Sequence, residues 1–523
     1  MSHWIIVPIV LPAFLASFVI LAARHHIVIQ RAVSVAGIAV LLTVAAGLAL
    51  QAADGTVTLY RLGDWAAPFG IVLVADRLST LMTLLTAILA LHVVLYAIGS
   101  GWDTRGKHFH ALFQFQLMGI LGAFLTGDLF NLFVFFEVLL IASYGLMIHS
   151  GGTVRLRAGT QYVLYNLLGS TLFLFALGAL YAETGTLNMA DLAGRVRLIG
   201  EGGTVGIRVA AVLLLMVFAI KAALVPLHFW LPSSYAEAPA PVAALFAIMT
   251  KVGAYAIIRV YTLIFPPGLG ATAGLHEWWL GPAALVTIAV GSLGVLAARR
   301  LDRLVAFAVI GSMGMVMVAI SLFTEAGIAA ALYYIIHSTL AAGALFLICD
   351  LVRAVRGDLS LSAWLDGPGR VLTAALFFVA AIAMVGLPPL SGFVGKLLVL
   401  DAAFESPRAA WVWGTVLVTS LVSMVGFARA GSVLFWKPRS IPAEAEELAA
   451  AAADVTRPSA LSFAAAGALL AQLVGHTVLA GPISGYAGAV SAQLFAPEPY
   501  ISTVLNTPGR LSEPDEAEGE EGK

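Results

Sequence analysis

The sequence predicts an all-α membrane protein that crosses the bilayer about fourteen times. Of its 523 residues, 60% are hydrophobic and only 11% are charged, and the apolar residues form runs of the roughly 20 residues that a helix needs to span a bilayer. This composition excludes a soluble globular protein and a disordered chain. Prolines interrupt two of the long apolar runs, which predicts two broken helices.

The first run lacks a basic segment in front of it, so we expect an uncleaved first span rather than a secretory signal. The run at 370–402 is too long for one straight helix, and it contains Gly386, Pro388 and Pro389, which predict a break within it. In chain order, the runs lie at 4–23, 32–51, 77–98, 110–127, 129–149, 161–182, 207–230, 240–264, 276–297, 303–323, 327–350, 370–402, 410–435 and 459–480.

The basic residues of the connecting loops predict the orientation, because cytoplasmic loops carry the excess of Lys and Arg. The loops of one side hold few basic residues, chiefly Arg61, Arg77, Arg195, Arg197 and Arg408. The alternate loops hold many more: Arg24, Arg31, Arg105, Lys107, Arg155, Arg157, Arg299, Arg300, Arg303, Arg353, Arg356, Arg429, Lys437, Arg439 and Arg457. With fourteen spans, both termini are therefore expected outside the cytoplasm.

Charge and cysteine content exclude several kinds of partner and cofactor. A net charge of −1 gives no reason to expect a nucleic-acid partner, whereas the apolar surface requires membrane lipid. Cys349 is the only cysteine, so an intrachain disulfide and a Cys-ligated cluster are excluded, and we expect no cofactor in this chain. The histidines lack paired metal-ligand spacing, so no metal site is expected.

The two broken helices lie about 165 residues apart and each is followed by another span, which fits two inverted five-helix repeats. The expected organisation is N-terminal spans 1–3 in 1–109, a first repeat in 110–264 with its break near 221–226, and a second in 276–435 with its break near 386–392. A polar cytoplasmic linker at 436–458 precedes the last span at 459–480. The acidic tail at 503–523 is expected to be disordered.

Lys221 and Lys251 lie far from the ends of two strongly apolar helices. A lysine near the bilayer centre costs about 2.5–3.5 kcal/mol on insertion scales, and such residues usually face the protein interior and mark an ion or proton path. Pro226 has no N–H, which leaves the carbonyl of Ala222 without a helical partner and predicts a break beside Lys221. The alternative is a kinked packing helix whose lysine reaches an interface.

Glu137 lies among Phe, Val and Leu in the fifth run and needs a partner. Burial disfavours the charged forms of a carboxyl and an amine, whereas bringing the two together favours both charged forms. A pair of Glu137 and Lys221 whose distance changes would therefore switch the proton on the lysine. The alternative is a static buried salt bridge, whose loss would destabilise the protein.

The second half supplies His337 and Lys396 in the same kind of position. Pro388 and Pro389 free the carbonyls of Met384 and Val385, so Lys396 again lies a few residues from a break. A histidine both donates and accepts a proton near neutral pH, which suits a relay, although a lone histidine in an apolar helix is also a common hydrogen-bonded core residue.

The five residues Glu137, Lys221, Lys251, His337 and Lys396 lie on five different runs. Packed helices lie about 8–10 Å apart, so the row would extend roughly 40 Å, too far for direct side-chain hydrogen bonds. Water must then fill the gaps. Only six lysines occur in the chain and three of them belong to this row, which indicates a need for an amine that can lose its proton.

The segments VPLHFWLPSSYAEAP and TKVGAYAIIR resemble the central motif of the proton-translocating membrane subunits of respiratory complex I, membrane-bound hydrogenases and Mrp-type antiporters. The resemblance, clearest over about 70–435, is strongest to the Mrp D (Pha D) version. It implies that Glu137 and Lys221 form the ion pair, that Lys251 is the central relay, and that Lys396 ends the row, as in LPPLSGFVGK. His228, beside the first break, is expected either to link this path to the cytoplasm or to pack at an interface.

By this resemblance, the chain is expected to be the proton-translocating subunit of a multisubunit Na⁺(or K⁺)/H⁺ antiporter of a bacterial inner membrane. It would exchange cytoplasmic cation for external protons, use the proton motive force and serve pH homeostasis, with partners of the Mrp A, B, C, E, F and G types. It would not be an enzyme. The main alternative is a proton-pumping subunit of a complex I-like oxidoreductase or hydrogenase. A stand-alone solute transporter would need a pocket of convergent polar groups, which the sequence does not indicate.

One segment departs from the family pattern. RRLDRLVAFAVIGSMG is similar to the family's K-R-L-x-A-Y-S-S-I stretch, but Phe307, Ala308 and Val309 replace its Tyr-Ser-Ser. Because hydroxyls that would hold water are missing there, the sequence argues against a relay role for this helix.

Overall fold

The computed structural model describes residues 3–199, 204–362, 369–436 and 458–509, and it is almost entirely helical. The first half contains α1 (Val7–Leu21), α2 (Ile27–Ala52), α3 (Arg77–Gly99), α4 (Phe109–Leu125), α5 (Leu129–Met147), α6 (Thr153–Thr184), α7 (Met189–Leu198), α8 (Thr204–Lys221), α9 (Trp230–Glu237) and α10 (Ala240–Leu263). The second half contains α11 (Leu275–Ala297), α12 (Leu301–Ser321), α13 (Glu325–Arg356), α14 (Arg370–Val385), α15 (Ser391–Ala402), α16 (Ala409–Phe435), α18 (Ala460–Val478), α19 (Ala480–Phe495) and α20 (Glu498–Asn506).

The polytopic helical architecture is confirmed. In the described ranges, ten helices are long and apolar enough to cross a membrane, and three shorter apolar helices, α1, α4 and α14, accompany them. The run at 370–402 contains two helices, and the run at 207–230 ends where α9 begins. The linker at 436–458 and most of the tail at 503–523 lie outside the described residues. Residues 503–506 belong to α20, so the expectation of disorder from 503 onward is wrong for that part.

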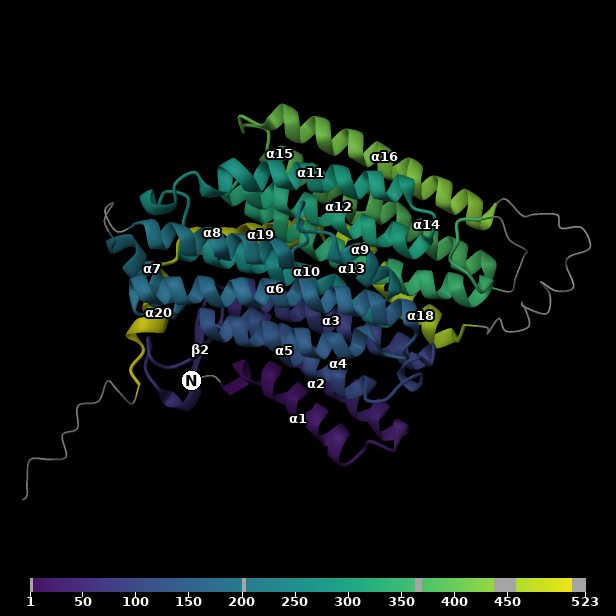
Figure 1. Ribbon diagram of the computed structural model, residues 1–523, viewed down its shortest axis with the longest axis horizontal. Coiled ribbons are helices and arrows are strands. Elements are labelled where there is room, and N and C mark those ends of the chain that lie inside the picture. Colours follow the sequence, from purple (N-terminus) through teal and green to yellow (C-terminus); the bar gives the residue numbers. More distant parts are fainter. Residues whose placement is uncertain (1–2, 200–203, 363–368, 437–457, 510–523) are drawn as a thin grey trace, which may run out of the picture.

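The helices lie side by side in an elongated array, with α1 and α2 at one edge and α16 at the other (Figure 1). Helices α10 and α13 form its centre. The most apolar stretch of α10 is 100% buried and that of α13 is 94% buried, whereas those of α2 and α16 are only 28% buried. A membrane helix buried on all sides contacts only other helices, so polar groups on α10 and α13 are shielded from lipid.

Small residues bring neighbouring helices close together, as is common in membrane proteins. Helices α11 and α12 pack most closely at Gly291, where an added Cβ would overlap the backbone nitrogen of Gly311. A larger side chain at Gly291 would therefore separate the two backbones.

A hairpin and two C-terminal helices were not expected from the sequence. Strands β1 (Thr58–Arg61) and β2 (Val72–Ala75) pair antiparallel between α2 and α3, and α19 and α20 follow the last expected span. The first and last described segments both contact this hairpin: the ring of His3 contacts Tyr60, and Arg61 donates to the carbonyl of Thr507 at 2.9 Å. Both ends of the described chain therefore lie on the same side of the helix array, which is consistent with an even number of spans.

A buried ion pair fixes the centre of the array to α3. Arg259 of α10 forms two hydrogen-bonded contacts with Asp76, at 2.7 and 2.8 Å, and the two side chains are only 4% and 3% exposed. Asp76 also caps α3 by accepting from the backbone N–H of Ser79. The ring of Tyr500 in α20 covers the Arg259 guanidinium at 5.1 Å, so the same pair holds the C-terminal helix.

A second ion pair anchors α2 at the opposite end of α3. Arg31 binds Asp103 at 2.6 Å, and His110 lies 3.2 Å from the same carboxylate. Burial raises the pKa of the Asp103 carboxyl, but the hydrogen bonds from His110 and Arg31 outweigh burial and hold that pKa below its usual value. The carboxylate therefore stays charged at neutral pH.

Replacing Arg259 with Ala should destabilise the protein by about 3–5 kcal/mol, because it leaves the Asp76 carboxylate buried without its partner. The measurement is the unfolding midpoint of the purified protein in a denaturing-detergent titration. Arg195→Ala is the control, because Arg195 is 47% exposed in its ion pair with Asp191, and a pair with an exposed member is worth about 1 kcal/mol or less. Equal midpoints for the two variants would contradict this role of the buried pair.

Candidate functional site

The first helix break places Lys221 at the end of α8. The helix ends at Lys221 and α9 begins at Trp230, so the interruption lies where Pro226 predicts it. The indole N–H of Trp230 donates to the carbonyl of Ile220, in the last turn of α8, at 2.9 Å. The Lys221 ammonium donates to Oδ1 of Asn166 in α6 at 3.1 Å, and the lysine is only 5% exposed. The break thus leaves the ammonium facing the protein interior.

Glu137 lies near Lys221 without touching it. Within the described chain, no hydrogen bond or ion pair joins the two side chains, and the buried Oε1 of Glu137 has no hydrogen-bond partner. Their charges interact through space, and the Lys221 nitrogen lies 5.8 Å from the centre of the Phe136 ring. The expected pair is therefore open in this structure, with Asn166 in the place of the carboxylate.

Lys251 is completely buried in α10, at 0% exposure. Its ammonium has no hydrogen-bond partner among the described residues. Helix α10 meets the end of α8 at Gly253, where an added Cβ would lie 2.7 Å from the backbone nitrogen of Ala222. Lys251 therefore lies within one helical turn of the close contact between its helix and the first break.

The second break places the Lys396 side chain, which belongs to α15, against the C-terminal end of α14. Helix α14 ends at Val385, Gly386 follows in the left-handed conformation, and α15 begins at Ser391. The Lys396 ammonium donates to the carbonyl of Val385 at 2.6 Å and to Oγ of Ser420 in α16 at 2.7 Å. The lysine thus binds one of the carbonyls that Pro388 and Pro389 deprive of a helical partner.

His337 connects α13 to this second break. Its Nδ1 lies 2.9 Å from Oγ of Ser391, and the side chain is 0% exposed. Its Nε2 has no hydrogen-bond partner in the described ranges. The ring lies close enough to Lys251 and Lys396 for their charges to act on it. His337 is therefore hydrogen-bonded to the first residue of α15 and lies within electrostatic range of both lysines.

His228 lies in the interruption between α8 and α9. It is 7% exposed, its ring packs against Phe229 at a centroid distance of 4.4 Å, and its Nδ1 has no partner in the described part of the chain. The geometry brings it to the first break, as expected, and both of its expected uses stay open.

Several polar residues that contact the row were not expected. Asn166, Ser391 and Ser420 bind Lys221, His337 and Lys396, respectively. The sequence marks them only as single polar residues in apolar helices, and their partners lie 24 to 55 residues away. His476 of α18 is 3% exposed, and neither of its ring nitrogens has a hydrogen-bond partner among the described residues.

Several buried polar atoms of the row and of the helices that contact it have no hydrogen-bond partner in the described chain. Buried polar groups in proteins normally have a protein or water partner, and buried waters typically serve such groups. In the described chain, the buried side-chain atoms of these helices without a protein partner include Gln114 Nε2, Gln116 Oε1, Glu137 Oε1, Ser170 Oγ, Lys251 Nζ, His337 Nε2, Gln472 Oε1 and both ring nitrogens of His476. Three of these atoms, on Glu137, Lys251 and His337, belong to the row itself, and buried atoms of this kind need water or another polar partner. No group of three or more His, Cys, Asp or Glu side chains suited to a metal ion occurs in the described ranges.

Comparison with known proteins gives consistent matches over nearly the whole chain. Residues 126–423 match the family model described as NADH:quinone oxidoreductase/Mrp antiporter, TM. The chain is 37% identical to a Rhizobium meliloti protein named as the probable D subunit of a K(+)/H(+) antiporter, covering 97% of this chain and 98% of that protein. It is also 37% identical to the Na(+)/H(+) antiporter D subunit of Bacillus subtilis, covering 97% and 100% of the two chains.

Solved structures show the same architecture. A chain of the Mrp complex from Dietzia sp. DQ12-45-1b superposes with a TM-score of 0.86 at 28% identity, covering 97% of this chain and 100% of that one. A chain of respiratory complex I from Thermus thermophilus superposes with a TM-score of 0.77 at 25% identity, covering 94% and 99%.

Replacing Asn166 with Leu should impair the function of this row, because Lys221 loses the acceptor that stabilises its ammonium. A hydrogen bond to a charged group contributes about 1.5–3 kcal/mol, so ion-driven proton movement in inverted vesicles should fall about tenfold or more. Thr171→Val on the same helix is the control, since Thr171 is exposed and binds only the backbone of its own helix. Unchanged proton movement in Asn166→Leu would contradict the importance of this contact.

Proposed function

The chain belongs to the NADH:quinone oxidoreductase/Mrp antiporter transmembrane family, and we propose that it is the D subunit of a multisubunit monovalent cation/proton antiporter. Its similarity to proteins named as antiporter D subunits covers 97% of the chain, which is the observation that carries this proposal. The chain is thus a transport subunit rather than an enzyme, and other antiporter subunits are its partners.

In this function, cytoplasmic Na⁺ or K⁺ leaves in exchange for external protons. The proton motive force supplies the free energy, because protons move inward down their electrochemical gradient while the cation moves outward. The relatives carry both sodium and potassium names, so the proposal includes both ions.

We propose that the protons pass along Glu137, Lys221, Lys251, His337 and Lys396. Each residue stands on a different helix, and the two outer lysines stand at the two helix breaks. Buried oxygens hold Lys221 and Lys396, whereas Lys251 depends on water. Closing Glu137 onto Lys221 would favour the protonated lysine, and the open arrangement lets the proton move on. His228 serves as the access from the first break to the cytoplasm.

We also propose that about fourteen spans contain two inverted five-helix repeats, at 110–264 and 276–435, after N-terminal spans in 1–109. Two features support this division. First, each proposed repeat contains one interrupted helix followed by a long helix, α8–α9–α10 in one and α14–α15–α16 in the other. Second, a buried oxygen binds the lysine at each interruption: an amide oxygen binds Lys221 and a backbone carbonyl binds Lys396. The last span, expected at 459–480, would correspond to α18, and α19 follows it directly.

The proposed location is a bacterial inner membrane, with partners of the Mrp A, B, C, E, F and G types. The bacterial relatives and the Mrp complex structure support this assignment. The most apolar stretches of α2 and α16, at the two edges of the array, are largely exposed, which leaves faces for lipid or for these partners.

The alternative, a proton-pumping subunit of a complex I-like enzyme, shares the fold with less similarity. The complex I chain is 25% identical, whereas the antiporter D subunits are 37% identical over nearly full length. Iron–sulfur or flavin proteins that co-purify with the chain would favour the enzyme.

Lys221→Ala and Glu137→Ala should each abolish cation-dependent proton movement in inverted vesicles while the complex stays assembled. Each variant removes one partner of the proposed switch, so the proton can no longer be held and released. Lys107→Ala is the control, because Lys107 lies exposed in the loop before α4. The assay compares Na⁺ with K⁺, and wild-type transport in both variants would contradict the switch.

Lys251→Arg should also lose transport, by about tenfold or more. The guanidinium keeps the positive charge but does not release its proton in proteins, so a relay stops while a structural charge would survive. Lys107→Arg is the matched control. Normal exchange by Lys251→Arg would show that Lys251 is needed only for its charge.

A further inference from the structure

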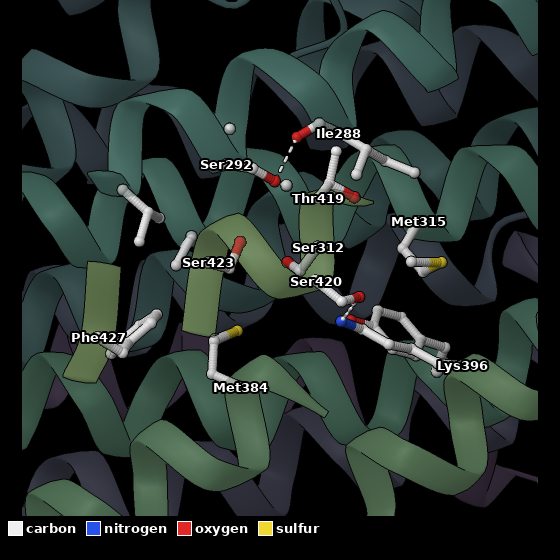
Figure 2. A pocket seen from close by; sticks show the side chains of 15 residues that line it. Ile288, Ser292, Ser312, Met315, Met384, Lys396, Thr419, Ser420, Ser423 and Phe427 are labelled. Carbon is white, nitrogen blue, oxygen red and sulfur yellow. Dashed lines mark hydrogen bonds between the residues drawn. The ribbon is translucent and has the colours of Figure 1, made fainter. Parts of the chain in front are cut away.

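A small cavity lies beside Lys396, between α11, α12, α15 and α16. It offers about 30 Å³ to the centres of water-sized molecules, and roughly 10–15 Å³ by this measure suffices for one water. Its polar lining consists of five serine or threonine hydroxyls, one phenol and one amine: Ser292, Ser312, Thr419, Ser420, Ser423, Tyr334 and Lys396. Figure 2 shows the Ser420 hydroxyl next to the Lys396 nitrogen, with Ser312, Thr419, Ser423 and Ser292 around the same space between the helices.

Three of these hydroxyls donate their hydrogen to their own helix. Ser292 donates to the carbonyl of Ile288 at 2.8 Å, Ser312 to that of Val309 at 2.8 Å and Thr419 to that of Thr415 at 2.6 Å. A hydroxyl has one donor and two acceptor lone pairs, so each oxygen keeps its lone pairs for the cavity. The lining is therefore rich in acceptors and suits a positively charged ligand.

The end of a half-helix adds to this preference. The carbonyl of Val385, the last residue of α14, accepts from Lys396 at 2.6 Å, and Ser420 accepts from the same ammonium at 2.7 Å. The C-terminal end of a helix carries partial negative charge. Unwound carbonyls and half-helix C-termini of this kind coordinate cations in secondary transporters.

Lys396 is the only charged side chain that lines the cavity, and no carboxylate of the described chain lines it. Tyr334 of α13 is the other titratable group in the lining, while α11, α12 and α16 contribute hydroxyl, small or apolar side chains. Outside the lining, His337 of α13 is a titratable group that interacts with Lys396 through space. Divalent cations such as Ca²⁺ prefer carboxylate ligands, so the chemistry of the lining favours a single positive charge.

We propose that this cavity is a monovalent cation site in which a dehydrated Na⁺ or K⁺ replaces the proton of Lys396. When an N–H bond of the Lys396 ammonium breaks, the proton leaves along the hydrated row and the amine keeps the electron pair. The cation then takes the acceptors that the ammonium held, on Ser420 and Val385, together with the hydroxyl oxygens. The cavity holds one positive charge in either state. Cation and proton are thereby made mutually exclusive, which is what an exchanger requires.

This inference rests on the proposed function, and it assigns to this chain one point at which the cation is bound. It also assigns α12 a role in ion binding, because Ser312 of that helix lines the cavity. The missing Tyr-Ser-Ser hydroxyls had argued only against a relay role for α12. The hydroxyl side chains allow cation binding to be tested separately from proton transfer, since their removal leaves Lys396 in place.

The test uses the complete complex in proteoliposomes, with proton movement measured over a range of Na⁺ and K⁺ concentrations. Ser292→Ala, Ser312→Ala and Thr419→Val should each raise the KM for the cation about tenfold, with the maximal rate changed less than about twofold. Thr86→Val is the matched control, because Thr86 is buried, binds its own helix in the same way and does not line the cavity. In the wild type, lowering the pH should raise the KM for the cation, as expected for competition with the proton of Lys396.

Three results would overturn the site. These are an unchanged KM in all three variants, a loss of maximal rate at every cation concentration with the KM unchanged, or a KM that does not respond to pH. The second result would mean that the hydroxyls hold only water for protons. Ser312→Thr keeps a hydroxyl and should keep the KM within about twofold, which separates loss of the ligand from a packing defect. Absence of cation-dependent proton movement in the wild type would instead contradict the proposed function itself.

Discussion

The structure depends on one constraint: an ammonium buried among helices needs oxygen atoms around it. Hydrocarbon and apolar side chains offer none, and an uncompensated buried charge is costly. The chain meets this need in three ways. Lys221 binds an amide oxygen and Lys396 binds a backbone carbonyl and a hydroxyl, whereas Lys251 has no acceptor among the described residues and is proposed to bind water.

A helix break supplies free carbonyl acceptors, and a buried ammonium supplies hydrogen-bond donors, so the two can satisfy each other. A break frees carbonyls that hydrocarbon cannot satisfy, and a nearby donor satisfies them. At the second break the donor is Lys396 itself, whereas at the first break the indole of Trp230 binds the carbonyl of Ile220 and Lys221 binds Asn166. The two breaks are therefore similar in position but different in chemistry. Lys221 lies near the carboxylate of Glu137, whereas Lys396 lies beside the hydroxyl-lined cavity.

The sequence predicts the helices and the position of both breaks well, because apolar length and proline act locally. It also singles out the five residues of the proposed row, since a charge within an apolar run is conspicuous. It does not predict their partners. Asn166 precedes Lys221 by 55 residues, and such contacts depend on how helices pack rather than on any periodic pattern. The β1–β2 hairpin was missed because its strands are short, and α19 and α20 because their helices are held by distant contacts such as that of Tyr500 with Arg259.

The central claim is that water fills the protein between Glu137, Lys221, Lys251, His337 and Lys396. It is tested most directly by a density map of the assembled complex in lipid at a resolution that shows ordered water. The account predicts water density at the unpartnered atoms of Gln116, Lys251 and His337, continuous from the first break to the second. Dry, closely packed side chains between Lys221, Lys251 and Lys396 would contradict it.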